Sequence, residues 1–81
     1  MSVYSVMLEG RENQKGFLIT IDVAGSSQAS AKSLALAEAS RRGLQIIGVE
    51  EVSRKAKSAG SATPEVIKVY GKSYFDLEGS E

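Results

Sequence analysis

Two segments near the start of the chain alternate between apolar and polar residues. The first runs from Val3 to Leu8 and the second from Phe17 to Ala24. A period of two residues is typical of a strand with one buried face. The stretch between them, Glu9 to Gly16, is polar and contains the turn-forming residues Gly10, Asn13 and Gly16. The pattern therefore predicts a β-hairpin in which this stretch is the loop.

The next segment, Gln28 to Arg42, is predicted to be a helix. It holds no glycine or proline and is rich in alanine, the residue with the lowest cost in a helix. Ser26 and Ser27 precede it and can cap its first amides. Gly43 follows it and suits the left-handed position of a Schellman cap, for which Leu44 supplies the hydrophobic contact.

The rest of the chain returns to strand patterns. Leu44 to Val52 and Glu65 to Leu77 are predicted strands, the second with a bulge or bend at Gly71. Ser53 to Pro64 is a basic, small-residue segment and is expected to be a mobile linker. The order β-β-α-β-β predicts an α+β fold, an antiparallel sheet with one helix packed on one face. Residues 1–77 are expected to form a single domain and residues 78–81 a disordered tail.

This architecture predicts which side chains are buried and which are uncovered. The expected core contains Val6, Phe17, Ile19, Ile21, Leu34, Ile67 and Val69. A single helix leaves the opposite face of the sheet open. The alternation places on that open face Thr20, Asp22, Lys68, Tyr70, Lys72 and Tyr74.

The composition argues against catalysis. The chain of 81 residues has no cysteine and no histidine, so it lacks thiol chemistry, the usual neutral-pH acid or base, and the common zinc and haem ligands. Gly71-Lys72-Ser73 ends like a phosphate-binding loop, but Val66 stands where that motif needs its first glycine. We therefore expect no enzyme activity, no cofactor and no metal.

Charge and segment composition bear on partners and location. The 10 basic and 10 acidic residues cancel, whereas nucleic-acid-binding proteins usually carry a basic excess. Apolar stretches are far shorter than a membrane span, and the first residues do not resemble a signal peptide. A cytoplasmic protein without membrane contact is expected.

The predicted partner-binding residues lie on the open face of the sheet. They are Asp22, Lys68, Tyr70, Lys72 and Tyr74. Tyrosines among charges are typical of protein interfaces, although the same pattern also holds single-stranded nucleic acid or simply covers a core edge. The alternative hypothesis is a nucleic-acid-binding protein that uses the lysines at 68 and 72 together with Arg54, Lys55 and Lys57. An edge strand of the sheet can also pair with a second copy of the chain, so a homodimer is a further alternative.

The first half of the chain carries one resemblance. Tyr4 to Leu8, Gly16 to Val23 and the alanine-rich segment Ser27 to Ala39 resemble the β-β-α opening of HicB-type antitoxins, and the layout is similar to that of small bacterial immunity proteins and phage-encoded inhibitors. The P-x-L-P-G-C segment usual in HicB-type proteins is absent, so no functional residue is carried over. The resemblance implies a small protein that binds and blocks another macromolecule; a structural, self-assembling protein is the remaining alternative.

Overall fold

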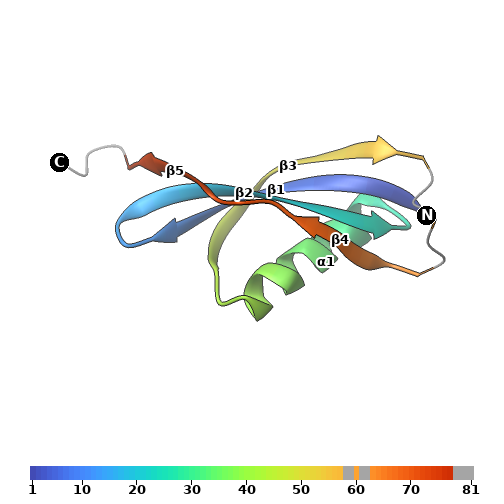
Figure 1. Cartoon of the computed structure of the whole chain (residues 1–81), viewed down its shortest axis with the longest axis horizontal. Helices are drawn as coiled ribbons and strands as arrows, with labels where there is room; N and C mark the ends of the chain where they lie inside the picture. The colour runs from blue at the N-terminus through green and yellow to red at the C-terminus, as the bar shows by residue number, and fades with distance from the viewer. Residues whose placement is uncertain (58–59, 61–62, 78–81) are drawn as a thin grey trace.

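The computed structural model describes residues 1–57, 60 and 63–77. Five strands and one helix follow each other in the order β-β-α-β-β-β (Figure 1). They are β1 (Ser2–Glu12), β2 (Lys15–Gly25), α1 (Gln28–Arg41), β3 (Gln45–Ala56), β4 (Glu65–Val69) and β5 (Ser73–Asp76).

The strands form one antiparallel sheet with the order β3-β1-β2-β4, and β5 pairs with the other half of β2. Helix α1 packs on one face only, so the predicted α+β fold is confirmed (Figure 1). The molecule is elongated, with extents of 47 × 21 × 19 Å. The tip of the β1–β2 hairpin and β5 project past the end of the helix (Figure 1). We call this projecting part the arm.

The β1–β2 hairpin is longer than its polar sequence suggested. The ladder continues to the pair Glu12↔Lys15, and only Asn13 and Gln14 form the turn. Both have positive φ, 51° and 67°, as the central residues of a type I′ turn must. The expected loop from Glu9 to Gly16 is therefore wrong: backbone pairing continues through these polar residues because the ladder uses only main-chain groups, while the side chains of Glu9, Arg11 and Glu12 stay partly exposed.

The core lies between α1 and one face of β1 and β2. Its largest fully buried side chains are Phe17, Leu8, Ile21, Val6 and Val23. Leu34 and Val69 are partly buried against it, whereas Ile67 is 48% exposed. The prediction of Ile67 as a core residue is wrong because a register shift in the β2–β4 ladder pairs Val66, and not Ile67, with a core residue. Val66 packs against the core in its place.

Helix α1 has the predicted ends. The Ser27 hydroxyl accepts a hydrogen bond from the Ser30 amide, and the Ser30 hydroxyl accepts one in return from the Ser27 amide. At the other end the Leu44 amide donates to the Ala39 carbonyl and the Gly43 amide to the Ser40 carbonyl, which is the Schellman arrangement. The fully buried residues of the helix are the alanines Ala31, Ala35 and Ala39, and Leu34 and Leu36 pack against the core beside them. The small alanine side chains allow the helix to lie close to the sheet.

Strand β3 continues to Ala56, so the first four residues of the expected linker Ser53–Pro64 are strand. Residues 58, 59, 61 and 62 of that linker, and the expected tail 78–81, lie outside the described residues. The β1–β3 ladder contains three register shifts. Bulges and charges on an edge strand discourage pairing with another chain, and β3 carries both.

Candidate functional site

The five predicted partner-binding residues do not share one face. The β4 ladder pairs Ile21 with Val69, and the β5 ladder pairs Leu18 with Ser73. Two residues of β2 therefore lie opposite three residues of the other segment, at 70–72. One extra residue reverses which face the following side chains occupy. The bulge expected at Gly71 is present. The predicted alternation, however, did not include the change of face that this bulge causes.

Two of the predicted residues, Asp22 and Tyr70, belong to a first cluster on the open face of the sheet. The Asp22 carboxylate accepts hydrogen bonds from the Ser5 hydroxyl at 2.6 Å, the Lys55 ammonium at 2.8 Å and the Tyr70 hydroxyl at 2.8 Å. These donors come from β1, β3 and the residue after β4. We call the four residues the Asp22 cluster. Through Asp22 it connects β2 with β1, with β3 and with the residue after β4 at this end of the sheet.

Asp22 is only 4% exposed, so a partner on the open face would reach little of this predicted binding residue. Burial acts to raise the pKa of this carboxyl, but the hydrogen bonds from Lys55, Ser5 and Tyr70 outweigh it and hold the pKa below its usual value. The carboxylate in turn raises the pKa of Lys55. The cluster contains the Asp22–Lys55 ion pair, in which the two charges cancel, and the carboxylate accepts hydrogen bonds from all three other members. This arrangement suits a structural role and not acid–base catalysis.

The ring of Tyr70 lies close to two lysine ammonium groups. The Lys68 ammonium lies 4.6 Å from the ring centroid and the Lys55 ammonium 5.7 Å from it. The Tyr70 hydroxyl is bonded to Asp22. A nucleic-acid base that stacked on this ring would compete with these ammonium groups for it. Tyr70 is therefore poorly placed as a stacking platform.

The residues after the bulge form a second cluster, on the helix side of the arm. Glu12 accepts hydrogen bonds from the Lys72 ammonium and, at 3.0 Å, from the Tyr74 hydroxyl. The hydrogen bond from Lys72, and to a smaller extent the one from Tyr74, lowers the pKa of Glu12. The bond to Glu12 in turn raises the pKa of Lys72. The ring of Tyr74 meets that of Phe17 edge-on, with 6.2 Å between centroids. Tyr74 is thus held in one orientation while 49% of it stays exposed.

Phe75 presents a second aromatic ring on the opposite side of the arm. It pairs with Gly16 in the β2–β5 ladder, and its ring fills the space above that glycine, where a Cβ would lie 2.3 Å from ring carbons. Phe75 is 37% exposed. The sequence analysis assigned Phe75 no role in binding. The only signal for one was the presence of a glycine and an aromatic residue that pair across the strands. We call Lys72, Tyr74 and Phe75 the β5 surface.

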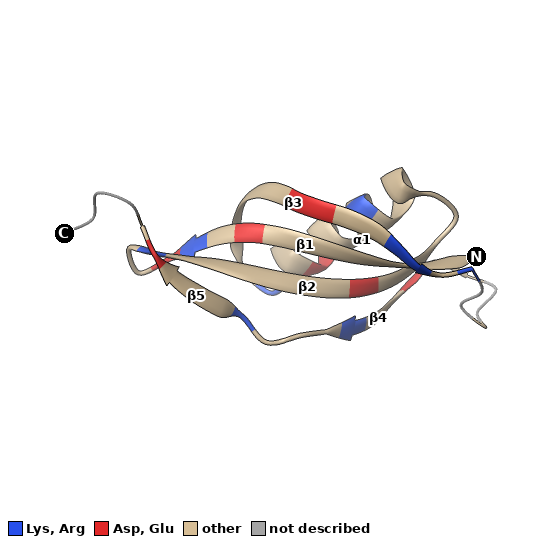
Figure 2. Ribbon diagram, turned by 90° about the horizontal axis from the view of Figure 1, so that it is seen from above, with Lys and Arg blue, Asp and Glu red and all other residues tan. Residues whose placement is uncertain are grey.

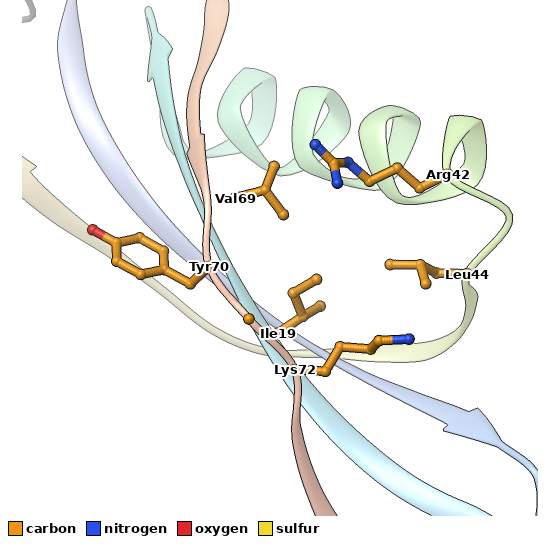
Figure 3. Close-up of a pocket in the computed structure, with 7 residues that line it drawn as sticks. Ile19, Arg42, Leu44, Val69, Tyr70 and Lys72 are labelled. Atoms are coloured by element: carbon orange, nitrogen blue, oxygen red, sulfur yellow. The ribbon is translucent and has the colours of Figure 1, made fainter.

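A groove of about 430 Å³ lies beside the β5 surface, between the end of α1 and the crossing from β4 to β5 (Figure 3). Ile19, Leu44 and Val69 supply its apolar lining. Arg42 and Lys72 reach it from opposite sides, and the side chain of Tyr70 points away from it (Figure 3). No sequence motif marks this groove, because its residues come from three separate segments.

The alternative nucleic-acid residues do not form one basic surface. Lys55 is bound to Asp22 on the open face, whereas Arg54 pairs with Tyr4, a core residue on the helix side. Lys57 follows the end of β3, and its carbonyl accepts a hydrogen bond from the Ser2 hydroxyl. Basic and acidic positions are interleaved over the sheet (Figure 2).

Within residues 1–57, 60 and 63–77, no three histidine, cysteine, aspartate or glutamate side chains gather as metal ligands would. The same part of the chain contains no helix with the length and apolar character needed to cross a membrane. Comparison with known proteins found no matching family model, no matching curated protein and no matching solved structure.

Proposed function

We propose that this chain is a non-enzymatic binding protein that recognises and blocks a protein partner, and that the β5 surface is the centre of the contact. The observation that carries the proposal is the exposure of two consecutive aromatic residues, Tyr74 and Phe75, whose rings lie on opposite sides of the projecting arm. Aromatic residues that bury a large area at low entropic cost are frequent anchors of protein interfaces. Because β5 is at the edge of the sheet, one partner can contact both rings.

The arm is also suitably rigid. Tyr74 is fixed by its bond to Glu12 and its edge contact with Phe17, and Phe75 is seated on Gly16. Side chains that are already ordered lose less entropy on association. The surface therefore has the preorganisation expected of an inhibitor that binds tightly through a small area.

A protein partner is favoured over nucleic acid for two reasons. The net charge is zero, and Lys55 and Lys72, which would contact phosphate, already neutralise Asp22 and Glu12. Phosphate contacts supply most of non-specific nucleic-acid affinity. Binding to nucleic acid would require these ion pairs to open.

The proposal is tested by capture and mapping. The tagged chain captures its partner from a lysate of the organism that encodes it, and mass spectrometry identifies that partner. Amide hydrogen exchange of the purified complex should then show protection in β5 and at the hairpin tip. Protection confined to β3 or to the outer face of α1 would contradict the proposal. So would binding to single-stranded or duplex nucleic acid with a Kd below about 1 μM that weakens steeply as salt rises.

A further inference from the structure

We propose that the groove between α1 and the β4–β5 crossing receives an apolar side chain of the protein partner that lies next to a carboxylate, so that the partner binds through an acidic, apolar segment. This inference rests on the proposed function, because the groove adjoins the β5 surface. It goes beyond that function by naming the chemistry of the segment recognised.

The lining of the groove provides the place for an apolar group. Ile19 and Val69 lie on neighbouring strands of the sheet, and Leu44 comes from the turn that follows α1. A volume of about 430 Å³ is within the range of ligand clefts and exceeds what one aliphatic or aromatic side chain fills. Burying such a side chain removes apolar surface from water on both partners.

The charges around the groove favour an acidic neighbour. Its charged lining residues, among those the structure describes, are Arg42 and Lys72, but the Lys72 ammonium is already paired with Glu12, so Arg42 is the lining cation left for a partner. Glu38 binds Arg42 and also Arg41, so these three residues together retain one positive charge. Arg42 is bonded to Glu38 through Nε, and its terminal nitrogens are the donors best placed to bind a carboxylate in the manner usual for arginine.

The groove and the β5 surface are continuous through one residue. Lys72 lines the groove, and its ammonium lies 5.2 Å from the ring centroid of Phe17 and 5.6 Å from that of Tyr74. The strand ladder is interrupted here: Tyr70 donates its amide to the Thr20 carbonyl, and regular pairing resumes at Ser73. A partner segment anchored on Tyr74 can therefore continue directly into the groove.

The first experiment identifies the recognised chemistry. Random dodecapeptides displayed on phage are selected on the folded, full-length chain. We expect enrichment of sequences in which leucine, isoleucine or phenylalanine adjoins aspartate or glutamate. In NMR spectra a synthetic peptide of that sequence should shift the signals of Ile19, Val69 and Gly71. Basic or charge-free consensus sequences, absence of enrichment, or shifts confined to other surfaces would overturn the inference.

Matched variants then test the charges. The substitution Arg42→Gln should weaken the selected peptide by about tenfold or more, since the charge-assisted contacts of this guanidinium with the peptide carboxylate are lost. The control is Lys32→Gln, which removes one exposed cation elsewhere on the surface and should leave the affinity unchanged. Thermal melts check that each variant is folded. Equal affinities of the groove variant and the control would overturn the role of Arg42.

A competition separates this inference from the proposed function. If the captured partner is lost on Tyr74→Ala but the selected peptide does not displace it, the proposed function stands and the groove inference fails. If the peptide displaces the partner, both are supported. Selection of a small organic carboxylate from the lysate in place of a protein, detected by mass spectrometry of the purified chain, would overturn the partner named here.

Discussion

The ring of Phe17 lies on Gly10, its cross-strand partner, so closely that a Cβ on Gly10 would be 2.3 Å from Cζ of that ring. The Gln45 carbonyl oxygen would be 2.6 Å from the same Cβ, and backbone cannot move aside as a side chain can. Gly10→Ala should therefore lower the free energy of unfolding by about 1–3 kcal/mol, the usual cost of overpacking. Urea denaturation measures this change.

Gly48 is the matched control for that substitution. A Cβ there meets nothing within 4 Å, and Gly48 is not among the residues with positive φ. Gly48→Ala should leave stability unchanged or raise it by up to about 1 kcal/mol, because alanine restricts the unfolded chain. Equal losses in the two variants would show that Gly10 is not the point of close approach.

The buried alanines of α1 lead to a second prediction. Ala35 is fully buried between helix and sheet, so Ala35→Leu should cost about 1–3 kcal/mol. Ala37 is exposed on the same helix, and Ala37→Leu should change stability by less than about 0.5 kcal/mol. Thermal melts of both variants give the comparison. A neutral Ala35→Leu would mean that the helix does not lie as close to the sheet as described.

The Asp22 cluster should contribute to stability more than an exposed ion pair does. Asp22→Ala removes the acceptor for Ser5, Lys55 and Tyr70 and should lower the free energy of unfolding by about 1–3 kcal/mol. Asp76→Ala, which breaks an exposed ion pair with Lys15, should lower the free energy of unfolding by much less than Asp22→Ala does. Denaturant titration of both variants decides whether the cluster holds the sheet together.

The carboxylates of the folded protein should make its stability decrease in acid. The pKa values of Asp22, Glu12, Glu38 and Asp76 are lowered in the folded protein. At a pH near their ordinary pKa, about 4, the unfolded chain binds more protons than the folded one. This part of the stability is present above that pH and is lost as the pH falls through the lowered values.

The test is urea denaturation between about pH 7 and pH 3. The free energy of unfolding of the natural sequence should decrease over the acid part of this range. Asp22→Asn should show a shallower decrease, because one of the carboxyls with a lowered pKa is gone. Identical slopes for the two proteins would contradict a lowered pKa at Asp22.

The local signals in the sequence were sufficient for the fold and for the helix. Alanine content, Ser27 and Gly43 predicted α1 and both of its caps because each acts through neighbouring backbone atoms. The alternation in Phe17 to Ala24 predicted the central strand for the same reason. The hairpin turn at Asn13 and Gln14 was not predicted, because the positive φ at Gln14 is imposed by pairing of the two strands and is rare for glutamine.

The candidate site was only partly predictable. Lys68, Tyr70, Lys72 and Tyr74 share one alternation in the sequence, but the register against β2 splits them between two faces. Register depends on which residues of another strand lie opposite, and a local pattern does not contain that information. The same holds for Ile67, exposed by a shift of one residue, and for the groove, which exists only after α1 and β4 have packed.

The most direct test of the β5 surface as a binding site is the affinity of the captured partner for two single variants, measured by calorimetry. Tyr74→Ala removes an exposed anchor of the β5 surface. Ile47→Ala removes a side chain of comparable exposure, 50% against 49%, on the edge strand β3. We predict that Tyr74→Ala weakens binding by about 1–3 kcal/mol, roughly five- to 150-fold in Kd, while Ile47→Ala leaves it unchanged. Normal binding by Tyr74→Ala together with loss of binding by Ile47→Ala would contradict the account and place the partner on β3.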